Sequence, residues 1–73
     1  MTSSTLSERL EISRRCLDAA EKAFDEARRR AMAAETMAEL RHALFQVRAA
    51  AGVLLDALDR FSRDRIAARF GVV

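Results

Sequence analysis

The chain has 73 residues, of which 51% are hydrophobic and 33% charged, and its formal net charge is +2. A chain of this length forms at most one domain, and a lone core of this size is marginally stable. One cysteine and one histidine exclude an intramolecular disulfide and argue against a structural zinc site. We therefore expect oligomerisation or a partner protein to complete the core.

The composition favours helices and a bacterial, cytoplasmic protein. Proline is absent and glycine occurs only twice, as is typical of helical chains. Arginine supplies twelve of the thirteen basic residues, which fits a GC-rich genome. Because the N-terminus does not resemble a signal peptide and the weakly charged stretch 43–55 is too short to span a bilayer, we expect a cytoplasmic location without membrane association.

A first helix is predicted over residues 5–32, after a frayed tail at 1–4. Thr5 followed by Glu8 fits a capping box. Apolar residues then recur at alternating spacings of four and three, as in a heptad repeat. The predicted seam consists of Leu6, Leu10, Ser13, Leu17, Ala20, Phe24, Ala27 and Ala31. A neighbouring apolar row, Ile12, Cys16, Ala19 and Ala23, gives the helix the broad face of a bundle helix.

A second helix is predicted over residues 37–70, because the apolar repeat changes phase at a turn over 33–36. Thr36 and Glu39 fit a second capping box there, and Gly71 is predicted to stop the helix. The predicted seam consists of Met37, Leu40, Leu44, Val47, Ala51, Leu54, Leu58 and Phe61. Residues 62–70 either continue this helix or form a short third helix, because Ile66 and Phe70 fall off the seam.

The predicted fold is all-α: a single domain over 1–73 in which two antiparallel helices form a hairpin that dimerises into a four-helix bundle. One continuous rod is the alternative, since no glycine or proline forces the turn. Acid-to-base pairs four residues apart account for most of the charge on the exposed faces. They are Glu11–Arg15, Asp18–Lys22, Asp25–Arg29, Glu26–Arg30, Asp56–Arg60 and Asp59–Arg63.

Three titratable residues were considered for catalysis or metal binding. Glu39 and His42 have the E-x-x-H spacing of carboxylate-bridged di-iron bundles. His42, however, lies about 200° round the helix from Leu40, so it faces away from the predicted seam. Cys16 is interpreted as a small buried residue. We therefore predict a protein that is not an enzyme and that uses no metal or other cofactor.

The apolar residues between positions 44 and 61 are the strongest candidate site. They cover more than one face of the second helix, and exposing two or three of them costs several kcal/mol at ~25 cal/mol per Å². The predicted interface is Leu44, Phe45, Val47, Ala51, Leu54, Leu55, Leu58 and Phe61. Its partner is expected to be a second copy or a heterologous helical protein, and Leu54→Asp is expected to abolish assembly.

Two arginine clusters form a second candidate site, for anions. Each ends a predicted helix, where cations also complement the helix dipole. The candidate residues are Arg28, Arg29, Arg30, Arg60, Arg63 and Arg69. In an antiparallel dimer of hairpins the clusters of the two copies meet at each end of the bundle. A nucleic-acid-binding regulator is therefore the alternative function.

Two resemblances accompany these patterns. Alternating small and large seam residues over 13–27 and the end Ala68-Arg69-Phe70-Gly71 resemble plasmid copy-number RNA-binding hairpin dimers. Residues 17–58, with an Arg-rich end of the first helix and a Gly-containing apolar second helix, resemble the hairpin co-chaperones of type III secretion needle subunits. The latter resemblance departs in the turn, which lacks Gly and Pro, and in the basic C-terminal extension. Together they imply a hairpin regulator or chaperone, and neither assigns functional residues.

Overall fold

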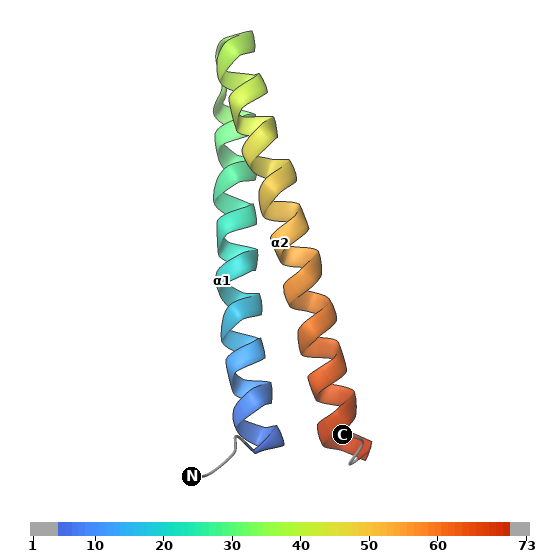
Figure 1. Cartoon of the computed structure of the whole chain (residues 1–73). Coiled ribbons are helices and arrows are strands. Elements are labelled where there is room, and N and C mark those ends of the chain that lie inside the picture. The colour runs from blue at the N-terminus through green and yellow to red at the C-terminus, as the bar shows by residue number, and fades with distance from the viewer. Residues whose placement is uncertain (1–4, 71–73) are drawn as a thin grey trace.

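The computed structural model describes residues 5–70, which form two antiparallel helices, α1 (Leu6–Ala33) and α2 (Met37–Phe70). The helices are joined at one end and diverge towards the other, where α1 begins and α2 ends (Figure 1). The molecule measures 52 × 22 × 15 Å. The all-α hairpin is confirmed, and the described residues contain no strand. The predicted tail at 1–4 and the predicted stop at Gly71 lie outside the described residues.

Both helices begin at the predicted threonine caps. The Thr5 hydroxyl oxygen accepts a hydrogen bond from the backbone N–H of Glu8, and Thr36 accepts one from Glu39, each at 3.1 Å. The Glu39 carboxylate in turn accepts a hydrogen bond from the backbone N–H of Glu35 at 3.1 Å. These bonds satisfy N–H groups that have no partner within the helix.

The turn needs neither glycine nor proline. Ala34 has φ −63° and ψ 134°, in the extended region that any L-residue can adopt. Its backbone N–H donates to the carbonyl oxygen of Ala31 at 3.3 Å, which closes the last turn of α1. The continuous rod is therefore wrong. A third helix is also absent from the described residues, because α2 runs through residues 62–70 without a break.

Removing the second cap tests how far local signals stabilise the hairpin. Thr36→Ala is expected to lower the free energy of unfolding by about 1 kcal/mol, because the Glu39 N–H loses its acceptor. Urea denaturation followed by far-UV circular dichroism measures the change. Thr36→Ser keeps the hydroxyl and is the matched control. Equal stability of all three proteins would show that this cap contributes nothing.

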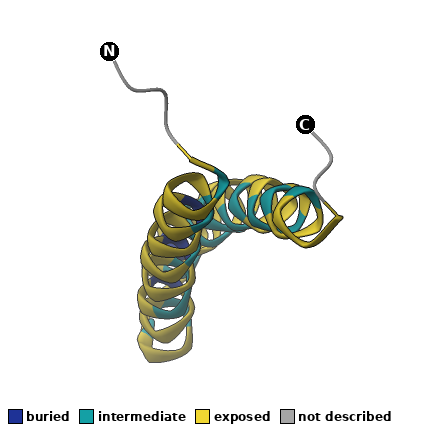
Figure 2. Cartoon of the chain, turned by 90° about the horizontal axis from the view of Figure 1, so that it is seen from below, coloured by how far each residue is buried: buried dark blue, intermediate teal, exposed yellow. Residues whose placement is uncertain are grey.

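The α1 seam is confirmed residue by residue. Ser13, Ala20 and Ala27 are buried, and the remaining predicted positions are half-buried. These half-buried positions are Leu6, Leu10, Leu17, Phe24 and Ala31. Burial is confined to a narrow stripe, and most of both helices is exposed (Figure 2). Large and small residues therefore alternate along the line that α1 presents to α2.

The predicted α2 seam is wrong at three of its eight positions, whereas Ala51 is half-buried as predicted. Met37, Leu44 and Leu58 are exposed. The positions turned towards α1 are instead Leu40, Ala43, Val47, Ala50, Leu54, Ala57, Phe61 and Asp64. Two sets of α2 positions have the same three-four spacing, and the sequence prediction took the set with the larger residues. The fold uses the alanines, which let the two helices approach and leave space for the large α1 residues.

The resulting core is very small. Within residues 5–70, the buried residues are Ala20, Ala27, Ala43 and Ser13, and no large side chain is fully buried. Alanine contributes little apolar area, so the internal seam provides modest stabilisation. The core of the hairpin alone is therefore only marginally stabilising, as expected for a chain of this length.

Candidate protein-interaction surface

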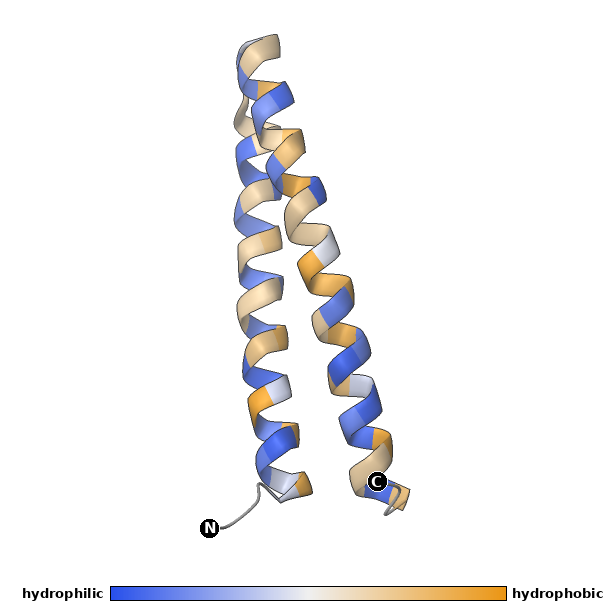
Figure 3. Ribbon diagram, in the orientation of Figure 1, coloured by the Kyte–Doolittle hydropathy of each residue, from blue (hydrophilic) through white to orange (hydrophobic). Residues whose placement is uncertain are grey.

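Four large apolar side chains on α2 point away from α1. Leu44, Phe45, Leu55 and Leu58 are exposed by 39%, 70%, 65% and 46%. We call these four residues, with Ala51 and Gly52 between them, the outer face. Hydrophobic residues recur along this part of α2 (Figure 3). An apolar surface of this extent is typical of an interaction site rather than of scattered surface residues.

The middle of the outer face is flat at the level of the backbone. A Cβ atom built on Gly52 would have no other group within 4 Å, so no part of the hairpin requires a glycine there. Ala51 beside it is also small. Together the two residues leave a stretch of α2 that another helix can approach closely.

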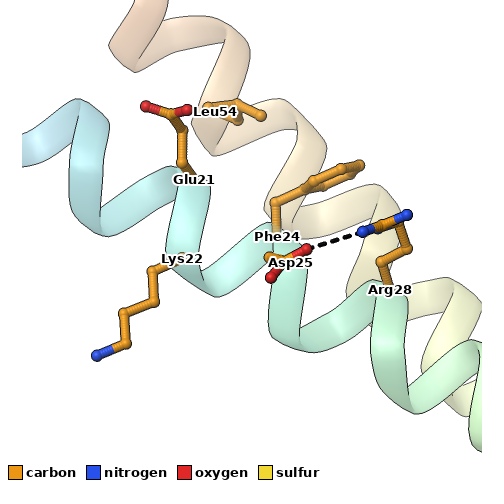
Figure 4. Close-up of a pocket in the computed structure, with 6 residues that line it drawn as sticks. All are labelled: Glu21, Lys22, Phe24, Asp25, Arg28 and Leu54. Carbon is orange, nitrogen blue, oxygen red and sulfur yellow. Dashed lines mark hydrogen bonds and ion pairs between the residues drawn. The ribbon is translucent and has the colours of Figure 1, made fainter.

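The other predicted interface residues have a different position. Val47, Leu54 and Phe61 are half-buried and belong to the seam with α1. Leu54 lines a surface hollow together with Phe24, Asp25 and other α1 residues (Figure 4). A substitution at Leu54 therefore acts on the hairpin itself. Leu54→Asp is thus not expected to act on assembly alone, whereas a substitution on the outer face is.

A second apolar strip lies on the opposite side of α2. Cys16 of α1 and Val53, Asp56, Ala57 and Arg60 of α2 line a hollow there. Cys16 is exposed, so its interpretation as a buried residue is wrong. Each helix of the hairpin has a single neighbouring helix, which covers one of its faces. The second apolar row of α1 therefore stays exposed. This strip has fewer large side chains than the outer face.

The exposed area of the whole chain is large for its mass. The chain exposes 6058 Å². A compact protein of 8.2 kDa is expected to expose about 4,500 Å². The difference, roughly 1,500 Å², measures how much more surface the elongated hairpin exposes than a compact protein of the same mass. A standard interface takes about 800 Å² from each partner, so the excess is sufficient for one.

The six candidate anion-binding arginines are all exposed. At the turn end, Arg28 and Arg29 both donate hydrogen bonds to Asp25, at 3.0 and 2.5 Å. At the open end, Arg63 pairs with Asp59 at 3.2 Å. Figure 1 places the two clusters at opposite ends of the hairpin. The turn-end cluster is thus partly neutralised, which weakens its attraction for phosphate.

Half of the predicted charge pairs form. Among the described residues, Glu11–Arg15, Asp25–Arg29 and Asp59–Arg63 lie within ion-pair distance, and Arg28 is a second, unpredicted partner of Asp25. All are on the surface, where a pair contributes about 0–1 kcal/mol. These charges keep the exposed faces soluble and need no ligand.

Asp25 gives the surface a measurable pH dependence. The hydrogen bond from Arg28 and the charge of Arg29 lower the pKa of this carboxyl below its ordinary value. A carboxyl whose pKa is lower in the folded state stabilises the fold above its unfolded-state pKa, and this contribution is lost as the pH falls through the folded-state pKa. Asp25→Asn is therefore expected to lower the melting temperature at neutral pH and to have no effect in strong acid.

Two measurements check this expectation. Thermal melts of the wild type and Asp25→Asn at both pH values test the stability difference. An NMR titration of the Asp25 carboxyl carbon tests the pKa, which should rise in the double variant Arg28→Gln, Arg29→Gln. An unchanged pKa in that variant would contradict the assigned cause.

Glu39 has a structural role at the turn. Its carboxylate accepts a hydrogen bond from the backbone N–H of Glu35, just before α2, and His42 is exposed. The described residues contain no group of three or more His, Cys, Asp or Glu side chains suited to hold a metal ion.

One polar pair was missed by sequence reasoning. The Ser13 hydroxyl, only 2% exposed, donates to the Asp64 carboxylate and lies 2.9 Å from the carbonyl oxygen of Arg9. Asp64 follows Ala57 by seven residues, so the correct α2 seam would have revealed it. The pair joins the two helices near their open end.

Comparisons with known proteins assign no relationship. No protein-family model, curated protein or solved structure matches this chain. Neither α1 nor α2, within residues 5–70, offers a stretch of sufficient length and hydropathy to traverse a bilayer. Functional inference therefore depends on the surface of the hairpin alone.

Proposed function

We propose that the chain is a non-enzymatic protein-interaction module, an adaptor, chaperone or small regulator, whose working surface is the outer face of α2. A second copy of the chain is its first partner, and the two hairpins pack into a four-helix bundle. One observation carries this proposal. Leu44, Phe45, Leu55 and Leu58 are exposed on α2, while every second position of the seam with α1 in residues 43–57 is an alanine.

The energetic argument rests on the four large side chains of the outer face. Burying a fully exposed Leu or Phe side chain contributes about 1.5–3 kcal/mol. Since the four residues are exposed by roughly half on average, covering them contributes on the order of 5 kcal/mol per copy. This is similar to the whole stability of a small domain. Assembly thus supplies stabilisation that the alanine seam does not.

The proposal is tested by the concentration dependence of thermal unfolding. Association stabilises the folded state by mass action, so the melting temperature of a self-associating hairpin rises with protein concentration. We expect such a rise over a hundredfold concentration range, followed by far-UV circular dichroism. A concentration-independent transition would contradict self-association. A poorly helical sample that orders only when a foreign helix is added would favour a heterologous partner instead.

Nucleic-acid regulation is the second candidate, supported by the exposure of all six cluster arginines. It predicts binding that weakens steeply with salt, because phosphate contacts release counterions. Fluorescence anisotropy with labelled duplex RNA measures this binding. Replacing Arg60, Arg63 and Arg69 together by Gln should abolish it without loss of helicity. Retained affinity in that variant would contradict this candidate.

A further inference from the structure

We propose that the outer face pairs with the outer face of a second copy in the antiparallel direction, about a two-fold axis at Ala51. This inference rests on the proposed function and adds the direction and register of the pairing. It follows from the symmetry of the apolar residues, the distribution of charge along the outer face, and the area available for an interface.

The apolar residues are placed symmetrically about Ala51. Leu44 and Leu58 lie seven residues before and after it, so all three occur at the same position of the heptad repeat. A two-fold axis through Ala51 places Leu44 of one copy opposite Leu58 of the other, twice. Ala51 then meets its own counterpart at the axis, and Gly52 lies one residue from it, where its open backbone permits close approach.

Charged residues lie within the outer face and are distributed unequally along the helix. Arg41 and Arg48 precede Gly52, and Asp59 follows it. All three are exposed, and they fall within about 20° of one another round the helix, between Leu55 and Phe45. The middle of the outer face is therefore basic in its first half and acidic in its second.

This asymmetry selects the antiparallel direction. In this register Asp59 of each copy lies within two residues of the position opposite Arg41 of the other, so two equivalent contacts form. A parallel pair in register would instead place Arg41 opposite Arg41 and Asp59 opposite Asp59, so like charges would face each other. The 3.2 Å pair of Asp59 with Arg63 is exposed on both sides and is readily exchanged.

The available area is consistent with this pairing. The excess exposed surface of the chain is roughly 1,500 Å², more than the 800 Å² per partner of a standard interface. In a two-fold arrangement the same patch is used by both copies, so the outer face itself is not left open to recruit further copies. A closed dimer is therefore the expected assembly.

Cysteine cross-linking tests the direction. In a Cys16→Ser background, which removes the exposed native thiol, Arg41→Cys and Asp59→Cys are prepared as separate proteins, and both are checked for helicity. We expect a disulfide-linked heterodimer when they are mixed under mild oxidation, and little product from either protein alone. Efficient cross-linking of Arg41→Cys to itself, with none in the mixture, would overturn the antiparallel inference.

Charge reversal provides an independent test in the intact apolar interface. Asp59→Arg opposes like charges and is expected to weaken the dimer roughly tenfold. The double variant Arg41→Asp, Asp59→Arg is expected to regain wild-type affinity, and failure to regain it would overturn the inference. A wild-type protein that is monomeric at every concentration would instead overturn the proposed function, so the two failures are distinguishable.

Discussion

Leu55→Asp is expected to convert the dimer into a helical monomer. Leu55 is 65% exposed on the hairpin, so an aspartate there costs the isolated hairpin little. In the proposed dimer the same residue loses about 1.5–3 kcal/mol of apolar burial and introduces a charge that must lose water without a partner. The dissociation constant should rise roughly a thousandfold or more. Sedimentation velocity measures the dissociation, and circular dichroism shows that the helices remain.

Val53→Asp is the matched control for this change. Val53 is two residues away, about 200° round the helix, and 59% exposed on the side that carries Cys16. It should leave the dimer intact. If Val53→Asp dissociates the protein and Leu55→Asp does not, the second apolar strip, not the outer face, is the interface.

Leu54→Asp is expected to unfold the hairpin itself. Leu54 is half-buried against α1 and lines the same hollow as Phe24 (Figure 4). Truncating a large apolar core residue costs about 2–5 kcal/mol, and a partly buried carboxylate adds to that cost. With a core of three alanines and a serine, the loss should exceed the stability that remains. Far-UV circular dichroism at 25 °C should show a largely unfolded chain.

Leu54→Met is the matched control, because it changes the residue without the lost volume and the added charge of Leu54→Asp. A volume-conserving change costs less than about 1.5 kcal/mol, so this variant should stay helical. Full helicity and an unchanged melting temperature in Leu54→Asp would show that Leu54 does not hold the two helices together.

The hairpin was predictable because its signals are local. The threonine caps, the change of phase and the alternating α1 seam each involve residues close in the chain. The α2 seam was not predictable, because α2 contains two series of apolar residues with the same spacing, and both include Leu40, Val47, Leu54 and Phe61. One adds the leucines at 44 and 58, the other adds Ala43, Ala50 and Ala57. Apolar content favours the first series, whereas packing against Phe24 and Leu17 of α1 favours the second.

The same distinction explains which residues of the predicted interface are exposed. Exposed members, here Leu44, Phe45, Leu55 and Leu58, were expected because the apolar residues of α2 exceed what one neighbouring helix can cover. Which of the eight residues face outward depends on the α2 phase, and that is a tertiary property. Cys16 was misplaced for a related reason, since a hairpin buries a narrower stripe of α1 than a complete bundle does.

The molecular mass in solution tests the central claim most directly. Light scattering across a dilution series, without added partner, should give a mass of about 16 kDa, twice the 8.2 kDa of the chain. This result would mean that a second copy covers the outer face. A fully helical protein of 8.2 kDa at every concentration would contradict the account, because the hairpin would then be stable with its outer face in water.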